Sequence, residues 1–364
     1  MQARRSILIT GAGGLIGSHL CEAFAAAGWE VRALDREGTD TTCARAAGAA
    51  VVQADLERPE GALVAAGLAQ GVQLVAHATF PDGNEIPSAL AAARAACAAA
   101  LSARAPLLLL SSCTVYGRPR NLPCEEGELK APVDAHGEVR WAVEREAFLQ
   151  RRTRGLGLVV LRPALTYGPR QRRGLTAALV IAALAARADR AIWLPRRGPI
   201  VHSVHAADVA QAALLIAEHG AGLLDGRAFN VADDVPLPLE ELARAVLNAA
   251  GAREAGRLPY SPVPARLLLW LLRRAPDWLF WGPLNRRIAR SWLDAFHGAP
   301  PRPPPQLTPD LLEQLAADRY FDTQRLRALG FAPRHPSAVE GLARLAQGTR
   351  ERGQLPPARR QLKD

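Results

Sequence analysis

A glycine-rich turn near the N-terminus constrains the fold more than any other feature of this sequence. It follows an apolar run at Ser6–Thr10 and precedes an amphipathic segment that ends at Gly28. A strand, a glycine turn and a helix in this order let backbone amides converge on a diphosphate at the start of the helix. The turn therefore predicts a dinucleotide site that is formed by Gly11, Gly13, Gly14, Leu15, Ile16 and Gly17.

A carboxylate at the end of the second apolar run supports this prediction. Asp35 is placed to accept hydrogen bonds from an adenosine ribose. Its charge would repel a 2′-phosphate, which favours NAD over NADP, although Arg36 beside it leaves NADP open. The remaining predicted cofactor contacts are Asp55 and Leu56, which would flank the adenine, together with Ala76 and Pro163.

Short apolar runs alternate with alanine-rich helical stretches through most of the chain. This alternation predicts an α/β fold of the Rossmann type, with a doubly wound parallel sheet and right-handed crossovers. A further helix is expected from near Leu239 to Gly251. The predicted strands are Ser6–Thr10, Glu30–Asp35, Ala50–Ala54, Leu74–Ala78, Leu107–Ser111, Leu158–Arg162 and Arg227–Val231.

The domain organisation follows from this pattern and from a change in composition after about residue 255. We expect the cofactor-binding domain to comprise residues 1–165 and 200–235. A smaller C-terminal substrate-binding subdomain would comprise residues 166–199 and 236–345. The proline-rich stretch Pro300–Pro305 is typical of an extended linker, and the arginine-rich residues 346–364 are expected to form a disordered tail.

Composition excludes several classes of function. The net charge is +10, but only two lysines are present and the arginines are spread along the chain without a recognisable nucleic-acid module. Nucleic acid is therefore not expected as a partner. The five cysteines lack metal-ligand spacing, which indicates free thiols and no metal site. No apolar window reaches about 18 residues and the N-terminal run is too short for a signal peptide, so we expect a cytoplasmic protein.

Several motifs together carry a family resemblance over residues 5 to about 345. The glycines at 11, 14 and 17 match Gly-x-x-Gly-x-x-Gly, and the further motifs are Ser111–Gly117, Leu161–Arg170, Val204–Ala210 and Ala228–Val231. The sequence resembles the extended short-chain dehydrogenases/reductases of the epimerase/dehydratase branch. The resemblance implies NAD as cofactor and a homodimer formed through the helices that include His136–Gln150.

The catalytic pair that the resemblance implies is replaced in this chain. Enzymes of this family use Tyr-x-x-x-Lys for proton transfer and for holding the nicotinamide ribose, with a serine that polarises the substrate oxygen. Ser112 matches the serine position, while His136 takes the tyrosine position and Arg140 the lysine position. No Tyr-x-x-x-Lys occurs anywhere in the sequence.

The replacement leaves more than one interpretation open. In the first, His136 carries the proton, since an imidazole titrates near neutrality, and Arg140 holds the ribose but cannot relay protons. In the second, the domain binds cofactor or ligand without redox chemistry and serves as a sensor or assembly partner. In the third, His136 is an N-terminal helix residue without a role.

The substrate is predicted from the C-terminal part. Cys113 and Thr114 stand where dehydratases of this family carry Asp-Glu, which argues against a dehydratase. The segment Ser88–Ala103 lacks the family's Asn-x-x-Gly-Thr, which places the usual sugar-nucleotide pocket in doubt. The stretches Asp318–Asp322 and Leu326–Pro333 resemble the 3β-hydroxysteroid dehydrogenase branch.

An apolar segment with tryptophans and arginines adds a physical argument. Residues 265–296 contain the run Leu267–Leu272 and four tryptophans, which suits a membrane interface or the mouth of a lipid-binding pocket; an ordinary amphipathic lid is the alternative. We therefore predict an NAD-dependent oxidoreductase or epimerase that acts on a hydrophobic alcohol or ketone, such as a sterol or another lipid. A nucleotide-sugar epimerase or reductase is the alternative enzyme.

Overall fold

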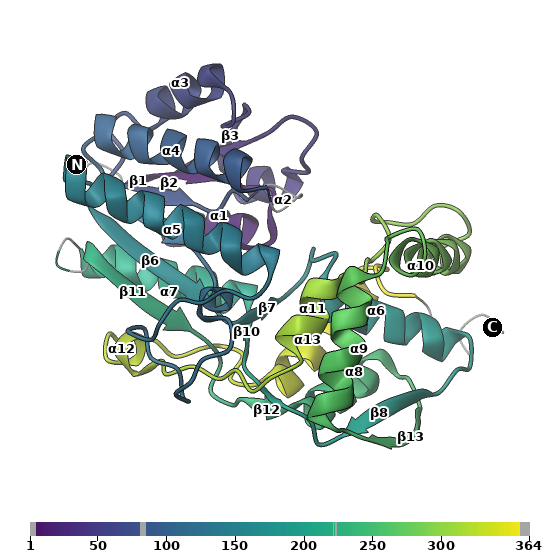
Figure 1. The fold of residues 1–364 in the computed structure, drawn as a ribbon. Helices are drawn as coiled ribbons and strands as arrows, with labels where there is room; N and C mark the ends of the chain where they lie inside the picture. Colours follow the sequence, from purple (N-terminus) through teal and green to yellow (C-terminus); the bar gives the residue numbers. More distant parts are fainter. Residues whose placement is uncertain (1–4, 81–84, 221, 223, 357–364) are drawn as a thin grey trace. The chain divides into compact units, whose positions relative to one another are not determined.

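The computed structural model describes residues 5–80, 85–220, 222 and 224–356 (Figure 1). The chain divides into two compact units, which are described separately. The first unit comprises residues 1–164, 206–232 and 321–333, and the second comprises residues 165–205, 233–320 and 334–364. Within the described residues, no helix combines the length and the apolar character that a membrane crossing requires.

The first unit is built on a seven-stranded sheet in the order β11-β6-β5-β4-β1-β2-β3, and every pairing in it is parallel. Its inner strands are buried continuously, as a parallel sheet covered on both faces requires. The predicted fold is thereby confirmed. The strands are β1 (Ser6–Thr10), β2 (Glu30–Asp35), β3 (Ala50–Gln53), β4 (Leu74–His77), β5 (Leu107–Leu110), β6 (Leu158–Pro163) and β11 (Asp225–Val231).

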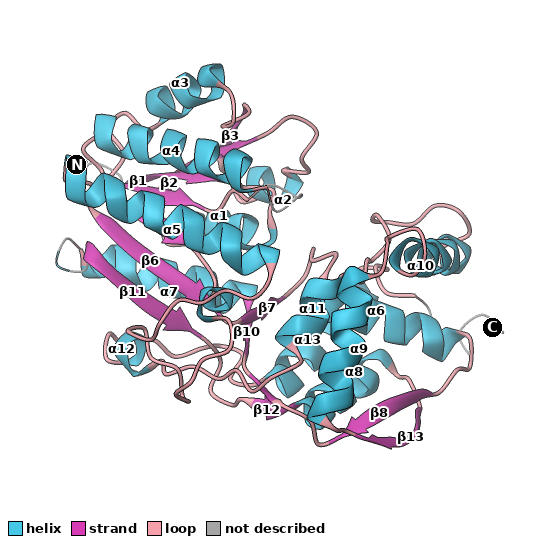
Figure 2. Ribbon diagram, in the orientation of Figure 1, coloured by secondary structure: helices cyan, strands magenta, loops and turns pink. Residues whose placement is uncertain are grey.

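Helices cover both faces of this sheet (Figures 1 and 2). Helix α1 packs against α7, while α4 packs between α3 and α5. Alanine lines the buried side of α4, and such small side chains let neighbouring helices approach closely. The helical elements of this unit are α1 (Leu15–Ala26), α2 (Thr42–Ala46), α3 (Pro59–Leu68), α4 (Ile86–Ser102), η1 (Cys113–Tyr116), α5 (Ala135–Arg154), α7 (Ala206–His219) and α12 (Gln324–Arg327).

The strand order positions the candidate site. The sheet runs outward in both directions from the neighbouring strands β1 and β4, so the crossover connections diverge at that point. In open α/β sheets, ligands bind beyond the carboxyl ends of the strands where the order reverses. The glycine turn follows β1, and His77 ends β4. Both ends therefore meet at the edge of the sheet where a dinucleotide is expected.

The second unit is mainly helical and has a core of its own, to which Tyr167, Leu242, Trp292 and Leu342 contribute. Three two-stranded pairs accompany the helices: β7 with β10, β9 with β12, and β8 with β13. The helices are α6 (Gly174–Arg187), α8 (Leu239–Ala250), α9 (Pro262–Arg274), α10 (Trp281–Ala295), α11 (Pro309–Gln314) and α13 (Ala338–Glu351). The strands are β7 (Leu165–Tyr167), β8 (Ile192–Arg196), β9 (Ile200–Val201), β10 (Ser203–His205), β12 (Leu237–Pro238) and β13 (Glu254–Pro259).

The units differ from the predicted domains mainly in two places, apart from residues 165 and 233–235, which belong to the second unit. Residues 200–205, expected in the cofactor-binding domain, belong to the second unit because β10 pairs with β7. Residues 321–333, expected in the substrate-binding subdomain, belong to the first unit, where the Asn230 side-chain amide donates to the Asp322 carbonyl over 3.2 Å. Contacts between residues far apart in the sequence decide both boundaries.

The predicted disordered tail, residues 346–364, needs a correction in its first part. Helix α13 continues to Glu351, and Ala346 and Thr349 are buried on it. Arg350 also donates to the Ala249 carbonyl, which ties α13 to α8. Residues 357–364 lie outside the described residues. The apolar stripe of α13, rather than the arginine content, decides the structure of residues 346–351.

Candidate functional site

The turn between β1 and α1 is built so tightly that only glycine fits at three of its positions. A Cβ on Gly11, whose φ is +77°, would lie 2.7 Å from the backbone carbonyl of Ala78. A Cβ on Gly17 would lie 1.9 Å from the Gly11 carbonyl oxygen. A Cβ on Gly13 would lie 2.4 Å from Thr39 Cγ2. The backbone of β1 therefore approaches both α1 and the end of β4 without an intervening side chain.

The start of α1 is arranged to face a negative group. Gly14 is the N-cap residue, and no side chain in the described part of the chain caps this helix. Leu15 and Ile16, the first residues of α1, are half-buried. Uncapped amides and the helix dipole together favour an anion at this position. The geometry suits the diphosphate that the sequence predicts.

Asp35 is held beside the glycine turn by two backbone amides. Its carboxylate accepts a hydrogen bond from Gly13 N over 2.7 Å and another from Arg36 N over 2.8 Å, and its exposure is 8%. An ionised carboxylate has about four lone-pair positions, so two bonds leave capacity for a ribose hydroxyl. The Arg36 side chain is exposed.

Asp55 and Leu56, which follow β3, have different environments. The Asp55 carboxylate accepts from Glu57 N over 3.0 Å, and a Cβ on Gly61 would lie 1.9 Å from the Asp55 carbonyl oxygen. Leu56 is only 5% exposed and belongs to the hydrophobic core of the first unit. Of the two residues predicted to flank an adenine, Leu56 thus contributes mainly to the core.

The last two predicted cofactor contacts lie within strands. Ala76 is fully buried in β4, where it pairs with Ile9. Strand β4 ends at His77, one residue earlier than the sequence predicts, and the following Ala78 and Thr79 lie against Gly11. Pro163 is the buried last residue of β6 and pairs with Val231.

Ser112 lies at the carboxyl end of β5, with its side chain directed into the next turn. Its hydroxyl accepts a hydrogen bond from Thr114 N over 3.2 Å and caps η1. The neighbouring Ser111 is buried and donates to the Glu144 carboxylate over 2.5 Å. The two adjacent serines therefore have different roles, and Ser112, which is half-buried, is the one accessible to a ligand.

The first turn of α5, which contains His136, lies against the η1 turn that Ser112 caps. The Asp134 carboxylate caps the helix by accepting from Gly137 N over 2.7 Å. A Cβ on Gly137 would lie 2.7 Å from the Thr114 carbonyl oxygen, so α5 packs directly against η1 at this point. Arg140 follows His136 by about one turn, and residues at this spacing share one helix face.

Arg140 is positioned by an aromatic ring and a carbonyl. Its guanidinium carbon lies 3.1 Å from the ring centroid of Phe80, and Nη1 donates to the Leu110 carbonyl over 3.4 Å. Burial lowers the pKa of Arg140 to about 9, so the group remains charged at neutral pH. The sequence alone did not identify Phe80 as its partner.

His77, at the end of β4, is a buried polar residue that sequence reasoning missed. Its Nδ1 lies 2.8 Å from the Thr10 hydroxyl, and its Nε2 has no hydrogen-bond partner among the described residues. Burial, with a smaller contribution from the Arg140 charge, lowers the pKa of His77 to about 3. A polar residue closing the apolar run Leu74–Ala76 is a signal that could have identified it.

Tyr116, the tyrosine of the first unit, is committed to a structural network. Its hydroxyl donates to Asn230 Oδ1 over 2.7 Å and accepts from Arg162 Nη1 over 2.8 Å, and its exposure is 1%. Burial raises the pKa of Tyr116 above its usual range. The Tyr116 hydroxyl is therefore not available to exchange protons with a ligand.

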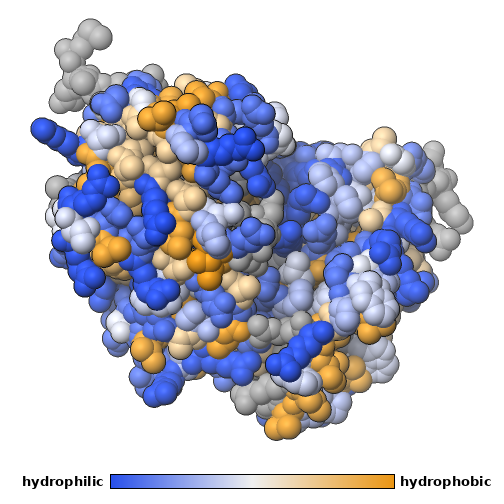
Figure 3. All heavy atoms as spheres, turned by 45° about the horizontal axis from the view of Figure 1, so that its top comes forward, coloured by the Kyte–Doolittle hydropathy of each residue, from blue (hydrophilic) through white to orange (hydrophobic). Residues whose placement is uncertain are grey.

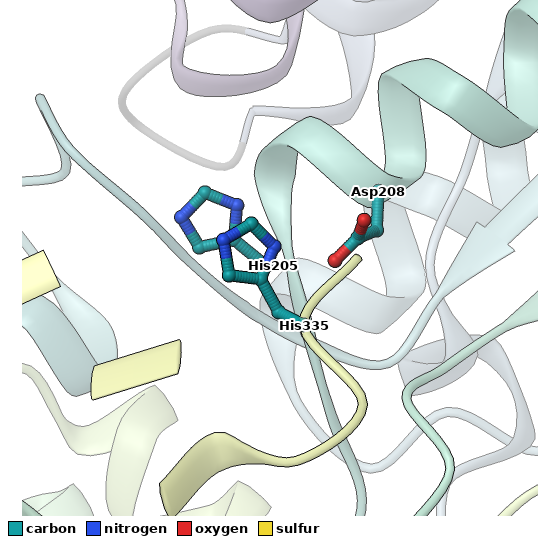
Figure 4. A group of neighbouring side chains, drawn as sticks. All are labelled: His205, Asp208 and His335. Atoms are coloured by element: carbon teal, nitrogen blue, oxygen red, sulfur yellow. The ribbon is translucent and has the colours of Figure 1, made fainter. Parts of the chain in front are cut away.

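The second unit contains a cluster of aromatic rings. His205 stacks on His335 (Figure 4). Their ring centroids are 3.9 Å apart, and His205 meets Tyr167 edge-on at 5.3 Å. Asp208, which Figure 4 also labels, lies on α7 in the first unit. We interpret the two histidines and Tyr167 as part of the packing of the second unit.

Comparison with known proteins decides the family. Residues 7–232, more than half of the chain, match the NAD dependent epimerase/dehydratase family. The chain belongs to this family. NAD is therefore its cofactor, and the residues present fit it: the uncapped start of α1 suits a diphosphate, and the Asp35 carboxylate beside the glycine turn suits a ribose.

Individual relatives share this architecture at low identity. UDP-glucose 4-epimerase of Rhizobium meliloti (strain 1021) is 28% identical over 180 residues, which are 43% of this chain and 50% of the relative. The chain thus spans about half the length of the curated relative that it matches. Solved structures extend the likeness in fold to nearly the whole chain, as two of them illustrate.

The first is the UDP-glucose 4-epimerase of Thermus thermophilus in complex with NAD. It superposes with a TM-score of 0.67 at 22% identity, over 95% of this chain and 99% of that one. The second is the UDP-glucuronic acid 4-epimerase of Bacillus cereus in complex with NAD, with a TM-score of 0.67 at 15% identity, over 95% and 99%. These likenesses confirm the fold of the chain.

Proposed function

We propose that this protein is an NAD-dependent oxidoreductase of the epimerase type, in which His136 carries the proton that family members pass through tyrosine. One observation supports this most. Helix α5 places His136 and Arg140 about one turn apart and packs against the turn that Ser112 caps, while Tyr116 is bound into the Arg162 network. An imidazole is the side chain best suited to general base work near pH 7.

Each residue has one part in the proposed reaction. When bound, NAD accepts or returns a hydride at its nicotinamide. His136 accepts the proton of the substrate hydroxyl as the carbinol becomes a carbonyl. Ser112 donates a hydrogen bond to the same oxygen, and Arg140 donates to the ribose hydroxyls. Because the Arg140 charge is fixed, it stabilises negative charge but does not exchange protons at neutral pH.

The relatives favour a nucleotide sugar as substrate. The curated relative and both solved structures described above are nucleotide-sugar epimerases. The hydrophobic alcohol or ketone predicted from the sequence, a sterol or lipid, is the second candidate. The exposed apolar face of α9 favours it.

The test is cofactor turnover with each substrate class. We expect the NAD-loaded protein to interconvert UDP-glucose and UDP-galactose, as followed by chromatography of the sugars because the hydride is returned in that reaction, or to show reduced-nicotinamide absorbance with a 3β-hydroxysteroid. His136→Gln should lower the rate by about 10²-fold or more while NAD affinity, measured by calorimetry, is retained. His219→Gln, which changes an exposed histidine at the end of α7, is the matched control.

Two results would refute parts of this proposal. NAD binding without product formation or spectral change, for every substrate tested, would indicate a binding protein such as a sensor or assembly partner. A turnover rate of His136→Gln equal to that of wild type would show that His136 does not carry the proton. The double variant His136→Tyr with Arg140→Lys restores the family pair, and it should keep turnover if only the proton carrier has been exchanged.

We also propose that the protein forms a homodimer through α5. Leu149 on this helix is 41% exposed, and the Arg145 guanidinium lies 5.9 Å from the Trp141 ring centroid. Mass measurement in solution tests the dimer, and Leu149→Asp should shift the protein toward the monomer. A monomeric wild type would contradict the proposal.

A further inference from the structure

Large apolar side chains are exposed together on α9 and on the loop that follows it. Within the described residues, 17 large hydrophobic side chains are exposed, and eight of them lie between residues 263 and 280. They are Val263, Leu267, Leu268, Trp270, Leu271, Trp278, Leu279 and Phe280. Single exposed apolar residues are ordinary, but a contiguous group indicates a binding surface.

The exposed residues of α9 follow the period of the helix. Val263, Leu267, Trp270 and Leu271 recur at a spacing of three to four residues, with exposures between 49% and 74%. Ala265 and Leu272 are half-buried instead. The helix thus has one apolar stripe directed away from the core, and the loop continues that stripe with Trp278 at 72% exposure.

The segment that carries this stripe is rich in arginine. Residues 262–303 contain seven arginines and two aspartates, with no lysine or glutamate. Arg274 lies over the Trp270 ring at 4.4 Å, and Arg286, Arg287 and Arg290 are exposed on α10. Helix α10 adjoins α9 because Trp281 Nε1 donates to the Leu272 carbonyl over 2.9 Å. The space-filling view shows hydrophobic side chains at the surface among strongly hydrophilic ones (Figure 3).

We propose that α9 and the loop 275–280 bind the surface of an anionic lipid bilayer. Leucine and tryptophan would enter the boundary between headgroups and acyl chains, while the arginines pair with lipid phosphates. A folded protein partner would not require this excess of positive charge. Since no described helix is long and apolar enough to span a bilayer, α9 lies in the interface rather than across it.

Vesicle flotation with the full chain tests the proposal. We expect binding to vesicles of phosphatidylglycerol and phosphatidylcholine, weak binding to pure phosphatidylcholine, and a decrease in binding as salt is raised. The double variant Leu267→Gln with Leu271→Gln should lower the partition coefficient by about tenfold or more, because two exposed leucines no longer enter the lipid.

A matched control distinguishes binding through this surface from nonspecific hydrophobic binding. Leu63→Gln with Leu129→Gln changes two leucines of the first unit that are 75% and 64% exposed, and it should leave flotation unchanged. Equal loss in both variants, or equal binding to neutral and anionic vesicles, would overturn the proposal. So would a concentration-dependent self-association that Leu267→Gln with Leu271→Gln abolishes, because the stripe would then be an interface between copies of the chain.

Discussion

Arg162 and Glu144 form a two-pronged ion pair in the interior of the first unit. Arg162 Nη2 donates to Glu144 Oε2 over 2.7 Å and Nε to Oε1 over 3.0 Å, with side-chain exposures of 3% and 0%. Burial alone would lower the pKa of Arg162, but the Glu144 carboxylate raises it above its usual range. The pair joins β6 to α5, the helix that carries His136.

Removing the carboxylate should therefore destabilise the first unit strongly. Glu144→Ala leaves a buried guanidinium without its counter-charge, for which we expect a loss of about 3–5 kcal/mol in the free energy of unfolding. Urea unfolding followed by circular dichroism measures it. Glu138→Ala, at an exposed position of the same helix, should stay within about 0.5 kcal/mol of wild type. A small effect at Glu144 would show that the network tolerates an unpaired charge.

The pH dependence of stability should report on His77. In the folded protein its pKa is lowered to about 3, while the unfolded chain takes up the proton near 6.5. The unfolded state thus binds more protons between these values, and stability falls as the pH falls below about 6.5. Between pH 7 and 5 this amounts to about 2 kcal/mol.

His77→Gln should remove that part of the pH dependence. The measurement is the difference between the unfolding free energies at pH 7 and pH 5, compared between variant and wild type. His219→Gln, at an exposed histidine, serves as the control. Parallel profiles for His77→Gln and wild type would mean that His77 is not held neutral in the folded protein.

Nucleotide selectivity should depend on Asp35. Asp35→Ala removes the acceptor of Gly13 N, and the negative charge expected to repel a 2′-phosphate is lost with it. We expect NAD affinity to fall by about tenfold and the preference over NADP to shrink. Calorimetry with both nucleotides measures this, with the exposed Glu37→Ala as control. An unchanged preference for NAD over NADP would indicate that the adenosine ribose does not lie beside Asp35.

Phe80 should act as a positioning residue for Arg140. Phe80→Leu removes the ring over which the guanidinium lies, and a partly desolvated contact of this kind contributes about 1–2 kcal/mol. We expect NAD affinity to weaken by about five- to tenfold, while Phe80→Tyr, which keeps an aromatic face, restores it. Equal NAD affinities of Phe80→Leu and wild type would show that Phe80 does not contribute to cofactor binding.

The sequence predicted the strands of the first unit to within about two residues at each end. Continuous apolar runs such as Leu107–Leu110 are typical of parallel strands buried on both faces, and Gly251 ended α8 as expected. Strand β4 ends at His77 rather than at Ala78, because the continuous apolar character of Leu74–Ala76 does not mark its last residue.

Relationships between distant residues could not be predicted in this way. Phe80 and Arg140 meet because β4 ends and α5 begins at the same edge of the sheet, and no local pattern encodes that meeting. Residues 321–333 join the first unit through contacts such as that of Asp322 with Asn230. The apolar content of α9 was evident, but which side of the helix remains uncovered depends on packing within the second unit.

The partial exposure of His136 in the first turn of α5 has a consequence for turnover. A phenol has a single oxygen, so a proton collected there must depart by the route it came or through a relay. An imidazole has two ring nitrogens, and it can collect a proton on one while the other exchanges with water. In the proposed reaction, His136 would therefore regain its starting protonation state by exchanging a proton with bulk solvent. Repeated cycles would then not require Arg140 to transfer protons.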